Sequence, residues 1–138
     1  MRVKLEDGAY EPTKAHPEDA GYDLYSREES TINPGASHRF DTGVSVEIPH
    51  GYVGIVCGRS GMNFNSSLTL DGVGVIDEGY TGTIGVKIYN HGDWTQFVQV
   101  GQRIAQLVIV PRFSGEVEIV DSLDKTERGD NGFGSSGK

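Results

Sequence analysis

The segment Gly58-Arg59-Ser60-Gly61 carries residue types that suit the binding of phosphate groups. The guanidinium of Arg59 presents a fork of donors that matches phosphate oxygens, and Ser60 adds a hydroxyl. Gly61 allows a bound anion to approach the backbone closely. Taken alone, four such residues are more often a surface turn with a solvated arginine, so the interpretation needs support from other segments.

A second candidate segment, residues 74–82 (GVIDEGYTG), places an acid and an aromatic residue among glycines. Asp77 directly follows an apolar run, which makes it the best candidate for a general base. Tyr80 offers a flat face to a sugar, while Gly74 and Gly85 allow a nucleobase to reach main-chain N–H and C=O groups. The alternative is that Asp77 caps the turn and Tyr80 packs on the surface.

Three polar residues lie in or beside expected strands. Three roles are open for Asp23: it holds a metal-bound water, it anchors an arginine or, as the simpler alternative, it stabilises a turn. Gln106 stands within the apolar run from Ile104 to Val110, where a buried amide needs hydrogen-bond partners. We expect Arg103, which opens the same run, to pair within the protein.

Short β-branched runs recur along the chain, and turn signals such as Asn33-Pro34-Gly35 separate them. These runs are expected to form the strands that position the candidate residues. This pattern predicts an all-β barrel or jelly-roll. Polar residues alternate with apolar ones in some runs, and others are continuously apolar. The expected strands are Val44–Ile48, Tyr52–Val56, Ile84–Ile88, Ile104–Val110 and Val117–Ile119.

Two local structures are expected between these strands. Residues 59–70 hold one or two helical turns, with Ser60 at the start. The apolar pair Val73 and Val75 and the pair Ile84 and Val86 flank the glycine-rich turn, which predicts a β-hairpin.

Composition bounds the function. A chain of 138 residues is long enough for one domain. Its net charge of −8 argues against long nucleic acids as partners but allows a nucleotide bound through a few focused cations. No apolar run is long enough to span a membrane, and the start resembles no signal peptide. The single Cys57 agrees with a reducing, cytoplasmic location, and four histidines without metal-ligand spacing predict no zinc site.

The last residues, 128–138 (RGDNGFGSSGK), have too few apolar side chains to fold alone and are expected to form a mobile arm. Phe133 is their one large apolar residue, and a side chain of this kind has a role only where it docks. Arg128, followed by glycines and serines, resembles a phosphate-cradling loop. The alternative is a flexible terminus without function.

Taken in order, five segments resemble the five motifs of the trimeric dUTPase family. One motif match alone is weak, whereas five in the same order across residues 20–137 are specific. The segments are AGYDLYS (20–26), GRSGM (58–62), GVIDEGYTG (74–82), GQRIAQLVI (101–109) and RGDNGFGSSG (128–137).

The resemblance implies a distorted jelly-roll β-barrel and hydrolysis of dUTP to dUMP and pyrophosphate with Mg²⁺. That reaction limits uracil in DNA and supplies dUMP for dTMP synthesis. It also implies a homotrimer, in which residues 1–127 form the barrel and residues 128–138 form an arm that closes over a neighbouring subunit's site.

By the same resemblance, Asp77 matches the aspartate that activates the attacking water, and Arg59 and Gln106 match catalytic positions beside the phosphates. Asp23 matches an aspartate linked through water to Mg²⁺, which the substrate phosphates mainly hold. Tyr80 matches the tyrosine that excludes a 2′-hydroxyl. The implied substrate-binding residues are Ser60, Gly61, Gly74, Tyr80, Gly85, Arg128, Phe133, Gly134, Ser135 and Ser136.

The chain departs from the family pattern at four positions. Gly58 stands where proline is usual, Gly79 where a second acidic residue is usual, and Asn131 and Ser136 differ in the tail. None of these changes removes a reacting group. Two alternatives remain: a dCTP deaminase on the same fold, and a nucleotide-sensing or protein-binding module.

Overall fold

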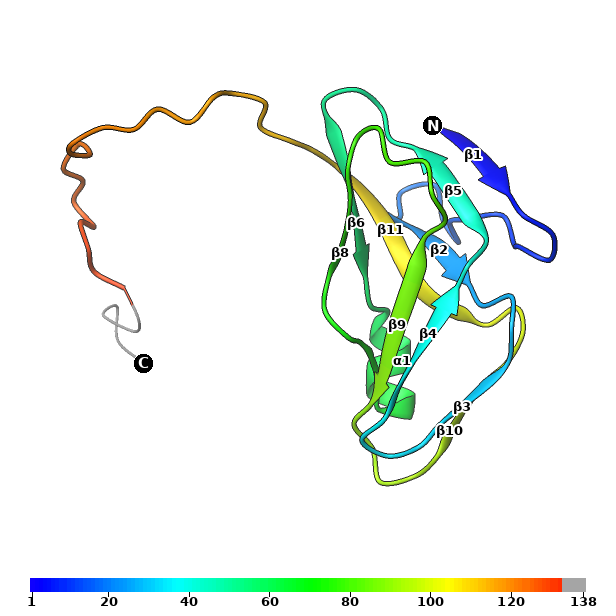
Figure 1. Cartoon of the computed structure of the whole chain (residues 1–138). Coiled ribbons are helices and arrows are strands. Elements are labelled where there is room, and N and C mark those ends of the chain that lie inside the picture. The colour runs from blue at the N-terminus through cyan, green and yellow to red at the C-terminus, as the bar shows by residue number, and fades with distance from the viewer. Residues whose placement is uncertain (133–138) are drawn as a thin grey trace.

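The computed structural model describes residues 1–132 of the chain, and in this part antiparallel strands and one short helix form a barrel-like body (Figure 1). The elements, in chain order, are β1 (Arg2–Leu5), β2 (Gly21–Tyr25), β3 (Ser30–Ile32), β4 (Ser37–Asp41), β5 (Val44–Glu47), β6 (Tyr52–Cys57), α1 (Ser60–Ser66), β7 (Leu68–Leu70), β8 (Gly74–Ile76), β9 (Gly85–Asn90), β10 (Gln96–Val98) and β11 (Arg103–Pro111).

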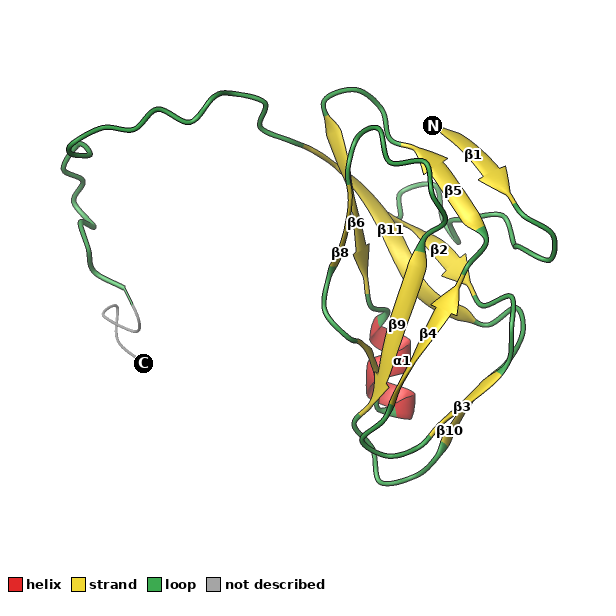
Figure 2. Ribbon diagram, in the orientation of Figure 1, coloured by secondary structure: helices red, strands yellow, loops and turns green. Residues whose placement is uncertain are grey.

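Two larger sheets make up most of the body (Figure 2). One has the strand order β2-β11-β6-β8 and the other has the order β4-β9-β7. Two-stranded pairs, β1 with β5 and β10 with β3, complete the described structure. The expectation of an all-β fold is therefore confirmed.

The core joins side chains from both larger sheets. Leu24 and Leu107 come from β2 and β11, and Phe40 and Ile88 come from β4 and β9; all four are fully buried. Burying an apolar side chain of this size contributes roughly 1.5–3 kcal/mol. The alternation in β9 places Val86 and Ile88 inward and Lys87 outward, as its sequence predicts.

Several local predictions are confirmed. Strands β5, β6, β9 and β11 overlap four of the expected runs. Helix α1 begins at Ser60, as expected, and ends where Ser67 takes a left-handed conformation with φ of 53°. Within residues 1–132, no helix is both long and apolar enough to cross a membrane.

The predicted β-hairpin around residues 74–82 is wrong. Strand β8 pairs with β6, with Ile76 opposite Gly54, while β9 pairs with β4 and β7 in the other sheet. Between the two strands, the backbone N–H of Ile84 donates to the carbonyl of Val44 at 2.8 Å, which ties the start of the second stretch to β5. Alternation shows which face of a strand is buried, but not which strand is its neighbour.

A strand predicted at Val117–Ile119 is absent from the described chain. Residues 112–132 leave the end of β11 as an extended segment that runs away from the body (Figure 1). Val117 is 91% exposed and Ile119 is 95% exposed, so the alternating pattern has no sheet to join. The last strand of the body ends at Pro111, and the division at residue 127 remains a prediction.

Candidate active site

A polar cavity of about 260 Å³ lies between β2, β11 and the start of α1. It brings together most of the residues expected around phosphate groups, although they come from distant parts of the chain. The predicted residues that line it are Asp23, Arg59, Ser60, Gly61 and Gln106. We call this hollow the phosphate cavity.

Asp23 holds two arginines at the phosphate cavity. Its Oδ1 accepts a hydrogen bond from Nε of Arg59 at 2.7 Å, and its Oδ2 accepts one from Nη1 of Arg103 at 3.2 Å. Asp23 is only 9% exposed, and two cations offset the cost of burying its carboxylate. The internal pairing expected for Arg103 is thereby confirmed. Arg59 uses Nε for this contact, which leaves its two terminal nitrogens as donors for an anion.

Gln106 fixes the turn that carries Arg59. Its Nε2 donates to the carbonyl of Gly58 at 3.0 Å, which supplies a partner for an amide in an apolar strand. A β-carbon at Gly21 would lie 2.6 Å from Oε1 and 3.1 Å from the β-carbon of Gln106, so a larger residue there would displace this amide.

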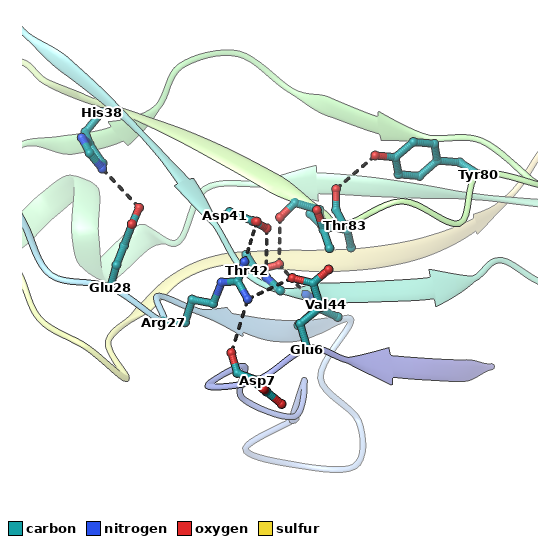
Figure 3. Close-up of polar contacts among 12 residues, drawn as sticks. Glu6, Asp7, Arg27, Glu28, His38, Asp41, Thr42, Val44, Tyr80 and Thr83 are labelled. Atoms are coloured by element: carbon teal, nitrogen blue, oxygen red, sulfur yellow. Dashed lines mark hydrogen bonds and ion pairs between the residues drawn. The ribbon is translucent and has the colours of Figure 1, made fainter.

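A second cavity, of about 300 Å³, lies beside β8 and β9. Gly74, Asp77, Tyr80 and Gly85, four of the predicted residues, line it. We call it the nucleoside cavity. The hydroxyl of Tyr80 donates to the carbonyl of Thr83 at 3.1 Å, which holds the ring at the edge of this hollow (Figure 3).

Asp77 and Tyr80 are the first and fourth residues of one β-turn. The N–H of Tyr80 donates to the carbonyl of Asp77 at 3.1 Å, and Gly79 has a φ of 90°. A turn with positive φ at its third residue favours glycine there. Gly79 therefore has a conformational reason to replace the acidic residue usual at this position.

Two polar residues of the nucleoside cavity, Arg39 and Thr83, were not predicted from the sequence. Arg39 lies on β4, and its guanidinium Nε would be 3.1 Å from a β-carbon at Gly85. Only the register of β4 against β9, which no local pattern reveals, shows this proximity.

A network of charged and polar side chains lies beside Thr83 (Figure 3). Asp41 accepts hydrogen bonds from the N–H of Gly43 at 3.0 Å and from Nη2 of Arg27 at 2.7 Å. These contacts, together with one from the Thr83 hydroxyl, hold the pKa of Asp41 below its ordinary value. The charged Asp41 thus anchors one wall of the nucleoside cavity to the body.

The two cavities share no lining residue. Ile76 pairs with Gly54, so Asp77 follows at the start of β6, whereas Arg59 comes after its last residue, Cys57. At about 3.3 Å for each residue, the backbones of Asp77 and Arg59 are separated by roughly 15–20 Å along the strand. Within the described chain, Asp77 and Arg59 thus belong to separate cavities.

Residues of the expected arm lie elsewhere. Arg128 is in the extended segment, where its Nε donates to the carbonyl of Asn131 at 3.1 Å, and the segment runs away from the body (Figure 1). Phe133, Gly134, Ser135 and Ser136 lie outside the described residues. Within residues 1–132, no three His, Cys, Asp or Glu side chains are grouped so that they could hold a metal ion.

An antiparallel β body with a phosphate cavity built on paired arginines, and a glycine-lined cavity beside an acid–tyrosine turn, defines a nucleotide-binding protein. Comparison with known proteins narrows the class. The family model described as dUTPase matches residues 8–137, and the chain belongs to the dUTPase family.

Individual relatives agree with this family. A deoxyuridine 5'-triphosphate nucleotidohydrolase from Trichodesmium erythraeum is 45% identical over 97% of this chain and 95% of its own length. The dUTPase of Staphylococcus bacteriophage 80alpha, solved with dUpNHpp, has a TM-score of 0.93 and 35% identity, and the match covers 99% of this chain and 98% of that one. A phage phi11 dUTPase structure, at a TM-score of 0.83 and 30% identity over 90% of this chain and 98% of that one, describes a structural Mg(II) ion.

Proposed function

We propose that this chain hydrolyses dUTP to dUMP and pyrophosphate, the reaction named by relatives that are 45% and 41% identical to it. It is a dUTP diphosphatase. One observation from the structure carries the assignment: the first and fourth residues of a β-turn, Asp77 and Tyr80, both line the nucleoside cavity beside Gly74 and Gly85. The same reaction limits uracil in DNA and supplies dUMP for dTMP synthesis.

The nucleoside cavity selects a deoxyuridine. Gly74 and Gly85 have no side chains, so the edge of uracil can form hydrogen bonds with their backbones. The ring of Tyr80, held through Thr83, stacks on deoxyribose and leaves no room for a 2′-hydroxyl. Rejection of UTP therefore rests on the fixed position of Tyr80.

Asp77 supplies the base for the chemical step. Its carboxylate takes a proton from a water as the water oxygen attacks the α-phosphorus, and the bond from that phosphorus to the α–β bridging oxygen breaks. Pyrophosphate leaves with the electron pair. Arg59 stabilises the charge that develops on the phosphates, and Gln106 keeps the Arg59 turn in place.

Mg²⁺ is the proposed cofactor, and the phosphate cavity fits an ion held mainly by the substrate. Both oxygens of Asp23 already accept hydrogen bonds from arginines, so a contact with the ion through water suits this residue better than direct ligation. When bound, the ion neutralises phosphate charge. A phi11 relative, 30% identical to this chain, binds a structural Mg(II) ion, so a protein of this family takes up this metal, which supports the choice of Mg²⁺.

The active enzyme is proposed to be a homotrimer, because each copy separates Asp77 from Arg59 along β6. A neighbouring copy brings its phosphate cavity to the nucleoside cavity, and residues 128–138 of a third copy close over both. Val117 and Ile119, which alternate and are exposed, suit a strand that joins a neighbour's sheet. We also propose a cytoplasmic location, supported by the single free thiol of Cys57.

Replacing the base tests the assignment. Asp77→Asn keeps the size of the side chain but accepts no proton, so pyrophosphate release from dUTP is expected to fall by about 10²–10⁴-fold. Binding of dUpNHpp and the melting temperature should stay close to those of the unmodified chain. Wild-type turnover in this variant would remove Asp77 from the mechanism.

A further inference from the structure

The carboxylate of Glu78 joins three segments at one end of the sheet β2-β11-β6-β8. Its Oε2 accepts hydrogen bonds from the N–H of Gly51 at 3.1 Å and from Nη2 of Arg112 at 2.8 Å. Its Oε1 accepts one from Nδ1 of His50 at 2.7 Å. Glu78 lies within the segment 74–82 that resembles a family motif, but the resemblance implies no role for it, and Arg112 lies outside all five segments.

The sheet order explains why these residues meet. Strand β6 lies between β11 and β8, and Gly51 immediately precedes it. Glu78 follows the end of β8 by two residues, and Arg112 is the first residue after β11. The N–H of Arg112 also donates to the carbonyl of Gly51 at 2.9 Å. Glu78 therefore reaches across the start of β6 to the point where the C-terminal segment leaves the body.

Glu78 is also the second residue of the turn formed by Asp77 and Tyr80. Gly79, the third residue, has φ of 90°, and open space surrounds the position that a β-carbon would take, so this residue adds no packing contact that fixes the turn. The hydrogen bonds of Glu78 therefore tie the turn to the body at a point between Asp77 and Tyr80.

The carboxylate is well suited to such an anchor. Hydrogen bonds from Arg112, His50 and Gly51, in decreasing order of effect, lower the pKa of Glu78 to about 2. The group is therefore charged throughout the neutral range. His50 is 92% exposed, so most of the anchoring comes from Gly51 and Arg112.

We propose that Glu78 is a positioning residue: its bonds to Gly51 and Arg112 set the direction of the Asp77 carboxylate and of the segment that follows β11. This inference rests on the proposed role of Asp77 as base. It predicts that a small displacement of the turn slows the chemical step while the nucleoside cavity still binds substrate.

Glu78→Gln tests this role because it keeps the shape of the side chain and removes its charge. We expect kcat for dUTP to fall about tenfold, since a small misplacement of a catalytic group is costly. KM should change less than about twofold, because the substrate contacts remain. Arg112→Met should lower kcat similarly, and the double variant should be no slower than the slower single variant.

Glu28→Gln is the matched control, because Glu28 also pairs with a histidine, His38, at 3.3 Å. It should leave kcat unchanged. Unchanged kcat in Glu78→Gln, an equal loss in Glu28→Gln, or a loss explained by a lower melting temperature would overturn the proposal.

A readout without turnover separates this inference from the proposed function. Trypsin cleaves after arginine, and the bonds of Arg112 to Glu78 and Gly51 hold that site to the body. Cleavage after Arg112 should be several-fold faster in Glu78→Gln than in the unmodified chain or in Glu28→Gln. Equal cleavage rates would overturn the anchor, whereas failure of the unmodified chain to release pyrophosphate from dUTP would overturn the function instead.

Discussion

Nε of Arg59 donates to Oδ1 of Asp23 at 2.7 Å, and this bond directs the arginine into the phosphate cavity. The two residues lie 36 positions apart in the chain and meet because β2 and the end of β6 flank β11. Asp23 thus has a structural role beside the functional one that we propose for it. Of the three roles that its sequence left open, the structure shows the anchoring of an arginine, and this role is compatible with the proposed support of a metal site.

Asp23→Asn should lower both stability and turnover. The variant leaves the guanidinium groups of Arg59 and Arg103 facing an amide, and we expect a loss of about 1–3 kcal/mol in the free energy of unfolding, because both arginines are partly exposed. kcat/KM for dUTP should fall as well. Denaturant unfolding and steady-state kinetics measure the two effects.

Asp71→Asn serves as the control for Asp23→Asn. Asp71 pairs with Lys87 at 2.6 Å on the surface, where an ion pair contributes about 0–1 kcal/mol. If both variants cost the same stability, the buried contacts of Asp23 have no special weight.

Gly79→Ala should destabilise the turn that carries Asp77 and Tyr80. The backbone of Gly79 has φ of 90°, and an alanine in a left-handed conformation costs about 1–2 kcal/mol, although no atom blocks its β-carbon. Gly58→Ala is the comparison, because Gly58 has no positive φ and its β-carbon would make only ordinary contacts, at 3.6 Å. Equal unfolding free energies for the two variants would argue against the observed turn.

Acid should weaken the anchor at Glu78. Its pKa is lowered from 4.5 to about 2 on folding, so its contribution to stability is complete above about pH 4.5 and disappears as the pH falls towards 2. The difference in unfolding free energy between the unmodified chain and Glu78→Gln should be constant near neutral pH and should shrink between pH 4.5 and 2. A difference that does not depend on pH would contradict the ionised anchor.

Mixing two inactive variants should restore activity. Asp77→Asn spoils the base and Arg59→Ala spoils the phosphate cavity, yet a site shared between copies can combine an intact Asp77 with an intact Arg59. Random assembly of a cyclic oligomer from equal amounts gives about a quarter of wild-type pyrophosphate release. If each site lay within one chain, co-refolded mixtures would stay as inactive as the separate variants.

Local patterns predicted where the strands and the helix lie better than they predicted which strands pair. The apolar run in β11, the alternation in β9 and the start of α1 at Ser60 all follow from side-chain periodicity and helix-start signals. The pairing of β8 with β6 depends on contacts between distant segments, and the expected hairpin was therefore wrong. Val117 and Ile119 carry a strand pattern without a partner strand in the described chain.

The site shows the same division. The residues that matched family motifs, such as Arg59 and Asp77, could be named from the sequence because their types and order are specific. Arg39 and Arg112 could not, since each reaches its neighbour only through strand register and sheet order. The separation of Asp77 from Arg59 along β6 was equally hidden, because no motif records a distance.

Pyrophosphate release from dUTP, measured beside dCTP, dTTP and UTP with Mg²⁺ and with EDTA, tests the central claim most directly. We predict rapid release from dUTP alone, which EDTA abolishes. Release from none of the four nucleotides, or ammonia release from dCTP in its place, would contradict the assignment of this chain as a dUTP diphosphatase.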